Sequence, residues 1–231
     1  MNVRRDASTL TVTVHGHDLI LSAHRAAFDP ALKLLLVADA HFGKDAVFRS
    51  HGIPVPVGST DENIARLDAL IAAHRPAQIV FLGDVLHGAQ SHAPEVLDAL
   101  HAWRARHAGI RLVIVEGNHD RHAGLPPVTL DYEAVQEPWR IGPWALCHHP
   151  QQVAGAYALA GHEHPVYRVT TRIESVRLPC FRFGAESGVL PAFGSFTGGF
   201  VVNPGGRASA GDDAVYVVAQ GQVMAVKPPT G

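Results

Sequence analysis

The sequence of 231 residues is poor in cysteine and in net charge, and it contains no long apolar run. Its two cysteines, Cys147 and Cys180, are too few for a disulfide framework or a cysteine-rich zinc site. No stretch of about 18 consecutive apolar residues is present, so we expect no membrane-spanning helix. The basic start, residues 1–6, has no apolar run behind it, so we expect no signal peptide. These absences favour a globular cytoplasmic protein.

The charge balance argues against one large class of nucleic-acid-binding proteins. Lys and Arg total 19 and Asp and Glu total 21, which gives a net charge of −2. A protein that grips duplex DNA through a broad basic face needs a clear positive excess. Histidine, by contrast, is abundant, with 16 residues. Half-protonation of these rings would move the charge to about +6 near pH ~6.5, so the charge argument depends on what the histidines do.

Five short apolar runs, each followed at once by polar residues, dominate the middle of the chain. They cover residues 34–38, 79–82, 112–115, 144–147 and 157–160. Continuous apolar runs of this length predict strands that are buried on both faces.

Helical patterns separate the first three of these runs. In the first, Ser59 and Glu62 match a capping box ahead of apolar residues at helical spacing. In the second, Pro94 suits the first helical position and Gly109 suits a C-terminal cap. Alternating strands and helices predict parallel strands, whose carboxyl ends lie along one edge of a sheet.

The two ends of the chain carry other patterns. Alternation predicts a strand at 10–14 and a hairpin of strands 215–218 and 223–226 that turns at Gln220 and Gly221. We expect short strands and ordered loops at 179–206, an exposed loop at 205–213 and a frayed tail at 228–231. No linker divides the chain, so we expect a single domain over residues 1–231.

Polar residues follow all five predicted strands. They are Asp39 and His41, Asp84, the run Asn118, His119 and Asp120, then His148, and finally His162 and His164. If the strands share one edge, three carboxylates, one amide and five imidazoles converge there. Burying such groups without partners costs several kcal/mol each, roughly. Divalent metal ions remove that cost, because imidazole and carboxylate are their natural ligands. A hydrogen-bonded polar rim without metal is the alternative.

Taken together and in order, these segments resemble the motif set of the calcineurin-like metallophosphoesterase superfamily. The motifs are Asp39-x-His41, Gly83-Asp84-x-x-His87, Gly117-Asn118-His119-Asp120, His148 and Gly161-His162-x-His164. Residues 38–44, 49–56 and 190–199 are similar to one branch, the DNA-ligase-associated phosphoesterases of bacteria. Two residues depart from the pattern. Ala40 stands where Leu is common, and His149 stands beside His148 where an acidic residue is more usual, so either ring of that pair is a candidate ligand.

The resemblance implies an α/β fold: a four-layer α/β/β/α sandwich of two mixed β-sheets flanked by helices. It also implies two divalent metal ions as cofactors, with manganese favoured and iron, zinc, cobalt or nickel as alternatives. Asp39, His41 and His164 would hold the first ion, and Asn118, His148 and His162 the second. Asp84 would bridge both ions, and a hydroxide between them would attack phosphorus in line.

The same resemblance assigns catalytic roles beside the metals. His119 would face the substrate phosphate, as a charge stabiliser or as the acid for the leaving oxygen, and Asp120 would orient its ring. His87 would lie at the metal rim and assist diester cleavage. The structural alternatives are a His119 ring that bonds a backbone carbonyl and a His87 ring exposed in a loop. Lys44 and Arg49 are either phosphate contacts or surface charges.

The implied function is a two-metal-dependent phosphodiesterase, specifically a DNA endonuclease in DNA repair. DNA would be the substrate, bound weakly because the chain is not basic. An ATP-dependent DNA ligase, a helicase and an exonuclease would be functional associates, and no membrane would be involved. The alternatives are a phosphoesterase for small nucleotides or lipid-linked pyrophosphate, and a catalytically inactive scaffold module with this fold.

Overall fold

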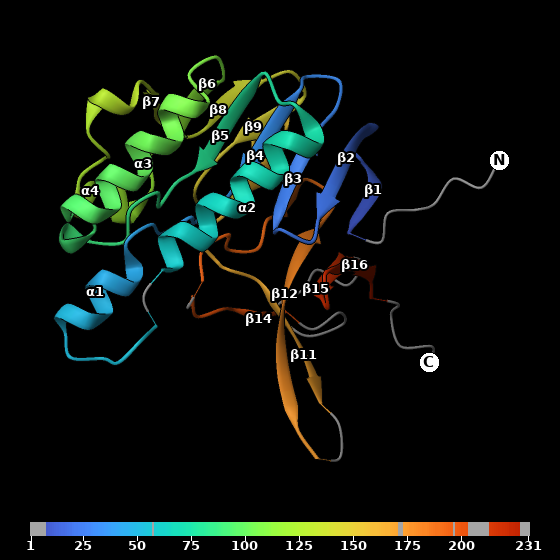
Figure 1. Cartoon of the computed structure of the whole chain (residues 1–231). Helices are drawn as coiled ribbons and strands as arrows, with labels where there is room; N and C mark the ends of the chain where they lie inside the picture. The colour runs from blue at the N-terminus through green and yellow to red at the C-terminus, as the bar shows by residue number, and fades with distance from the viewer. Residues whose placement is uncertain (1–7, 57, 171–172, 196, 203–212, 227–231) are drawn as a thin grey trace.

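The computed structural model describes residues 8–56, 58–170, 173–195, 197–202 and 213–226. Within these residues the strands form a seven-stranded and a nine-stranded sheet. Each sheet contains both parallel and antiparallel pairs. Apolar residues from both sheets share one buried cluster, so the sheets pack face to face (Figure 1). The two mixed sheets with their few helices confirm the expected α/β sandwich.

The first sheet follows chain order. It contains β1 (Thr9–Val14), β2 (His17–Ser22), β3 (Ala26–Asp29), β4 (Leu34–Val37), β5 (Gln78–Leu82), β6 (Arg111–Val115) and β7 (Glu133–Val135). Strands β1 to β4 are antiparallel and β4 to β7 are parallel. The predicted strand at 10–14 and the predicted parallel strands in this sheet are therefore confirmed.

The second sheet is built from the remaining strands. It contains β8 (Trp139–Ile141), β9 (Trp144–Leu146), β10 (Tyr157–Ala160), β11 (Val166–Thr170), β12 (Ser175–Phe183), β13 (Ser187–Val189), β14 (Val201–Val202), β15 (Ala214–Ala219) and β16 (Gln222–Ala225). Its order is β14-β11-β12-β13-β10-β9-β8, with β15 paired to β12 and β16 to β15. The turn between β15 and β16 places Gln220 and Gly221 at positive φ and confirms the predicted hairpin.

The five strands with polar ends do not share one sheet edge, as the sequence pattern had suggested. Three of them, β4, β5 and β6, lie in the first sheet, whereas β9 and β10 lie in the second. Short strands β7 and β8 come between the two groups along the chain. The predicted tail, all of the predicted loop at 205–213 except Asp213, and residues 203–206 lie outside the described residues.

The helices are α1 (Lys44–Ser50), α2 (Ser59–His74), α3 (Pro94–Arg106) and α4 (Asn118–Ala123), with 3-10 turns at Ala89–His92 and Val128–Leu130. The expected capping box is wrong, because Gly58 is the N-cap of α2 and the Ser59 side chain bonds Asp45 instead of the backbone. Pro94 does begin α3. The helix ends at Arg106 with His107 as its cap, so Gly109 is not the cap.

Two apolar layers hold these elements together. Leu34 and Leu36 of β4 point into the cluster between the sheets, and Leu35 and Val37 point into the cluster under α2 and α3. This alternation explains why β4 reads as a continuous apolar run. In the part of the chain that the structure describes, no α-helix follows Ala123, so the helical layer lies on the first sheet. Of the described helices, none is long and apolar enough to cross a bilayer.

Candidate metal centre

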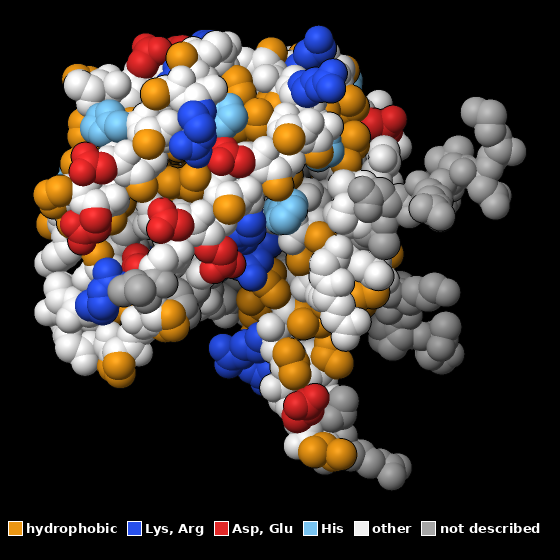
Figure 2. Space-filling view, viewed as in Figure 1, with side chains coloured by type: hydrophobic (Ala, Val, Ile, Leu, Met, Phe, Trp, Pro, Cys, Tyr) orange, Lys and Arg blue, Asp and Glu red, His pale blue; other side chains and the backbone are white. Residues whose placement is uncertain are grey.

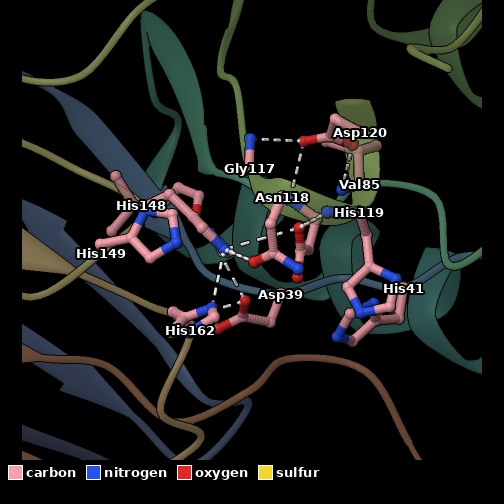
Figure 3. Close-up of polar contacts among 12 residues, drawn as sticks. Asp39, His41, Val85, Gly117, Asn118, His119, Asp120, His148, His149 and His162 are labelled. Atoms are coloured by element: carbon pink, nitrogen blue, oxygen red, sulfur yellow. Dashed lines mark hydrogen bonds and ion pairs between the residues drawn. The ribbon is translucent and has the colours of Figure 1, made fainter. Parts of the chain in front are cut away.

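Loops from both sheets meet at one end of the sandwich and bring the predicted site residues together. Figure 3 shows those of them that it labels. After β4 come Asp39 and His41, and after β5 come Asp84 and His87. The run from Asn118 to Asp120 begins α4, after β6. In the second sheet, His148 follows β9, and His162 and His164 follow β10. The site therefore forms where the two sheets abut.

Five of the predicted metal ligands have a left-handed backbone conformation. The φ angles are 52° at Asp39, 46° at His41, 52° at Asp84, 66° at His162 and 47° at His164. Residues other than glycine rarely adopt this region, and each instance costs on the order of 1–2 kcal/mol. Strain of this kind persists only where the surrounding structure holds it, and it clusters at functional sites. The backbone thus aims these side chains at the expense of local stability.

The first donor set contains Asp39, His41 and His164, whose ligand atoms all lie within 4.8 Å of one another. The Nε2 atom of His164 lies 3.5 Å from a carboxylate oxygen of Asp39 and 3.3 Å from Nε2 of His41. Asp39 is fully buried, and the backbone N–H of His162 donates to its Oδ2 at 2.9 Å. This bond links the loop after β4 to the loop after β10.

The second donor set contains Asn118, His148 and His162. His148 is fully buried, and its Nδ1 lies 3.0 Å from the carbonyl oxygen of Leu82, so Nδ1 carries the proton. The remaining Nε2 is then an acceptor, and it lies 2.7 Å from Oδ1 of Asn118 and 3.1 Å from Nδ1 of His162. Two acceptor atoms, Nε2 of His148 and Oδ1 of Asn118, thus point their lone pairs toward each other, which is favourable when a cation lies between them.

Asp84 lies between the two sets. Its Oδ1 is 3.5 Å from Nε2 of His148, and Asp39, Asp84 and His148 also have ligand atoms within 4.8 Å of one another. Burial, together with the charge of Asp39, raises the pKa of Asp84, and burial lowers the pKa of His41 and His148. Buried carboxylates beside neutral imidazoles form a donor set of nitrogen and oxygen atoms that fits divalent metal ions.

Asp120 does not orient the His119 ring, contrary to the sequence-based expectation. Its carboxylate accepts three backbone N–H bonds, from Asp84 at 2.8 Å, Val85 at 3.0 Å and Gly117 at 2.9 Å (Figure 3). It therefore joins the loop after β5 to the start of α4. Through these bonds Asp120 positions Asp84, which is a supporting role and not a contact with the imidazole.

The ring of His119 is held by His87 instead. Nδ1 of His119 lies 2.8 Å from the carbonyl oxygen of His87, and the two rings stack with centroids 4.9 Å apart. This is the carbonyl bond of the structural alternative, but it leaves Nε2 of the half-exposed ring without a hydrogen bond to any described residue. His87 also places Nδ1 3.2 Å from Nδ1 of His41, so it is not an exposed loop residue. Burial and the charge of Lys44 lower the pKa of His87 to about 4.

His148, His149 and His162 have ligand atoms within 4.8 Å of one another, and His148 and His149 differ in burial and in partners. His149 turns its Nδ1 toward Glu137, at 2.7 Å, and 40% of its side chain is exposed. Glu137 also accepts the backbone N–H groups of His148 and His149 at 2.7 and 2.8 Å. The acid that the motif lacks beside His148 therefore comes from the loop before β8. No local sequence signal marked Glu137, because it is 11 residues away along the chain.

Lys44 and Arg49 have different environments, although the sequence analysis gives both the same two alternatives. The Lys44 side chain is buried and has no hydrogen bond to a described residue. Burial lowers the pKa of the His41 ring, and the nearby charge of Lys44 lowers it further. Arg49 forms a 3.0 Å ion pair with Asp45 within α1. Lys44 thus belongs to the centre and Arg49 to the helix surface. The two residues differ in side-chain burial, which could not be predicted from the sequence.

Comparison with known proteins gives a consistent result. The sequence profile described as calcineurin-like phosphoesterase matches residues 32–207. The crystal structure of Pseudomonas putida nuclease MPE is 41% identical over 94% of this chain and 100% of that chain, with a TM-score of 0.81. The phosphoesterase Yfce from E. coli is 18% identical over 81% of this chain and 88% of that chain, with a TM-score of 0.40. No curated protein sequence matches.

Proposed function

Because the chain belongs to the calcineurin-like phosphoesterase family and is a hydrolase of phosphoester bonds, we propose that it is a two-metal phosphodiesterase that cleaves DNA. The observation that carries the proposal is the pair of donor sets with Asp84 between them. Asp39, His41 and His164 would hold one divalent ion, and Asn118, His148 and His162 the other. When bound, two such ions supply Lewis-acid charge and lower the pKa of water.

The chain's own residues would do the rest of the work. With Nδ1 donating to the His87 carbonyl, His119 in its imidazolium form can present Nε2–H to the substrate and give that proton to the leaving oxygen, which leaves the ring neutral. The buried ammonium of Lys44 adds positive charge beside the same site, where the phosphoryl group carries negative charge. Asp120 and Glu137 hold the loops that carry Asp84 and His148. These contacts would keep the donor atoms in place between turnovers.

The finer parts of the proposal rest on different support. The relative with 41% identity is a nuclease, which favours nucleic acid over a small nucleotide or a lipid-linked pyrophosphate. Manganese is the metal we propose, since mixed nitrogen and oxygen ligation accepts it. A role in DNA repair, beside an ATP-dependent ligase, a helicase and an exonuclease in the cytoplasm, follows from the sequence resemblance to the ligase-associated branch. We keep one domain over residues 1–231 as part of this proposal.

The test combines metal content with cleavage. Purified wild type should bind two equivalents of manganese, nick supercoiled plasmid and hydrolyse bis(p-nitrophenyl) phosphate. His119→Ala should keep both metals and lose roughly 10²–10⁴-fold in kcat for a diester, as removal of a general acid does. His101→Ala is the matched control, because that ring lies on α3 and bonds Thr129, away from the centre. Two bound metals without turnover of any phosphodiester would support the inactive scaffold and reject the proposal.

A further inference from the structure

A groove of about 310 Å³ lies between the metal centre and the base of the β11–β12 hairpin, which projects from the body of the protein (Figure 1). His164 forms the wall between groove and centre. Its Nε2 faces Asp39 at 3.5 Å, and its Nδ1 lies 3.2 Å from the carbonyl oxygen of Gly198, which also lines the groove. The groove therefore opens directly onto the predicted metal site.

One face of the hairpin borders this groove and carries two arginines. Arg168 pairs directly opposite Arg177, and Val166 pairs opposite Pro179. Opposite residues of an antiparallel pair project from the same face, and every second residue shares it. Since Val166, Arg177 and Pro179 line the groove, Arg168 continues the same face outward.

Among the described residues, these two guanidinium groups have no acidic partner. Both side chains are exposed, and neither donates a hydrogen bond or forms an ion pair within the described residues. Like charges placed directly opposite each other destabilise a strand pair. The two facing arginines therefore lower the stability of the free protein. A bound anion along this face would neutralise their charges and explain why they are placed opposite each other.

A second pair of arginines stands on the body side of the groove. Arg25 lines it and donates to the carbonyl oxygen of Gly194 at 3.3 Å. Arg66 lies beside Arg25, stacked on the ring of Phe193 with 4.4 Å between the guanidinium carbon and the ring centroid. Burial and the charge of Arg25 lower the pKa of Arg66 to about 10, so it stays charged at neutral pH. Figure 2 shows Lys and Arg side chains gathered where the hairpin meets the body.

We propose that this groove binds the phosphodiester backbone of a nucleic-acid strand beside the scissile phosphate, with Arg25, Arg168 and Arg177 contacting the flanking phosphates. The inference rests on the proposed function, because it takes nucleic acid as the substrate. Guanidinium groups match phosphate geometry and position a strand without reading its bases. The chain has a net charge of −2, so a local arginine track supplies the contact that the overall composition lacks.

The experiment compares Arg168→Ala/Arg177→Ala with Arg106→Ala/Arg140→Ala. The control removes the same charge from exposed arginines that contact Asp68 and the Ala154 carbonyl instead. Binding of a fluorescein-labelled single-stranded oligonucleotide is measured by anisotropy in EDTA, between about 50 and 200 mM salt. The hairpin variant should raise Kd at least tenfold and flatten the slope of log K against log salt by about 1.4, for two lost phosphate contacts. The control should stay within about twofold of wild type.

Two outcomes separate this inference from the proposed function. If the hairpin variant matches the control in Kd and salt slope, the groove is not a nucleic-acid site, whether or not the enzyme cleaves. If manganese-loaded wild type hydrolyses no phosphodiester but oligonucleotide binding still depends on Arg168 and Arg177, the proposed function is wrong and the groove is nevertheless a nucleic-acid site. With an active enzyme, the ratio of kcat/KM for DNA to that for bis(p-nitrophenyl) phosphate should fall at least tenfold in the hairpin variant. Thermal melting checks folding, and loss of the like-charge pair should leave Tm unchanged or higher.

Discussion

Gly83 tests how closely the backbone around the centre is fitted to its ligands. It precedes Asp84, has a φ of 81°, and its missing Cβ leaves room for the His148 ring. A methyl group here would lie 2.6 Å from Cγ of that ring and closer still to Nδ1, and 2.9 Å from the Cα atom of Gly117. Ordinary contact begins at 3.4 Å, so the ring would have to move by about 1 Å.

We expect Gly83→Ala to change two quantities that can be measured apart. The left-handed backbone costs roughly 1–2 kcal/mol of the free energy of unfolding once a Cβ is present. Displacement of the ring should weaken binding of the second metal at least tenfold and lower kcat/KM by about 100-fold, since an error of ~1 Å in a reacting site has that effect. Urea unfolding, manganese titration calorimetry and hydrolysis of bis(p-nitrophenyl) phosphate provide the three readouts.

Gly221→Ala is the matched control. Gly221 lies in the β15–β16 turn with a φ of 71°, and a Cβ there would meet no atom within 4 Å. The same strain without a clash should lower stability by roughly 1–2 kcal/mol and leave metal binding and turnover at wild-type values. A Gly83→Ala protein with wild-type manganese affinity and kcat/KM would refute the reasoning, because His148 would then not be held where the fold places it.

Three further predictions concern charge and metal. Asp120→Asn should lower the free energy of unfolding, measured in urea, by about 2 kcal/mol, because it replaces a buried carboxylate that accepts three N–H bonds. As a control, Asp131→Asn at an exposed side chain should change that free energy by less than about 1 kcal/mol. Equal losses in the two variants would contradict the role assigned to Asp120. The metal-free protein should lose stability as pH falls below about 6.5, since the unfolded rings of His41 and His148 take protons there while the folded rings, with lowered pKa values, do not. Each ring contributes at most about 1.4 kcal/mol per pH unit, and a flat profile from pH 7.5 to about 5.5 would exclude it. Removal of metal with EDTA should lower Tm by on the order of 10 °C in a thermal scan, and readdition of manganese should restore it; an unchanged Tm would mean that the centre holds no tight metal.

The sequence predicted the local elements of the core and the polar residues that come together at the candidate site. Apolar runs such as 34–38 and 112–115 are long enough and uniform enough to predict buried strands, and the polar residues directly after them predict the end of the sandwich where the site lies. The division of these strands between two sheets could not be read from them. Local patterns show that β9 and β10 are buried, but not which neighbours they pair with.

The hydrogen-bond partners of individual side chains could not be predicted from the sequence either. Asp120 lies next to His119 in sequence, which suggested a direct contact, yet its oxygens accept N–H groups from two loops that come together only in the folded protein. Ser59 matched a capping box but bonds Asp45 across a loop. In each case a contact between distant segments replaced the contact that the local motif favours.

Anomalous diffraction from crystals soaked in manganese is the most direct test of the two-metal centre. We predict two peaks in the anomalous map, one among Asp39, His41 and His164 and one among Asn118, His148 and His162, with the Asp84 carboxylate between them. A single peak, or peaks located away from these side chains, would contradict the assignment of this site as a two-metal centre.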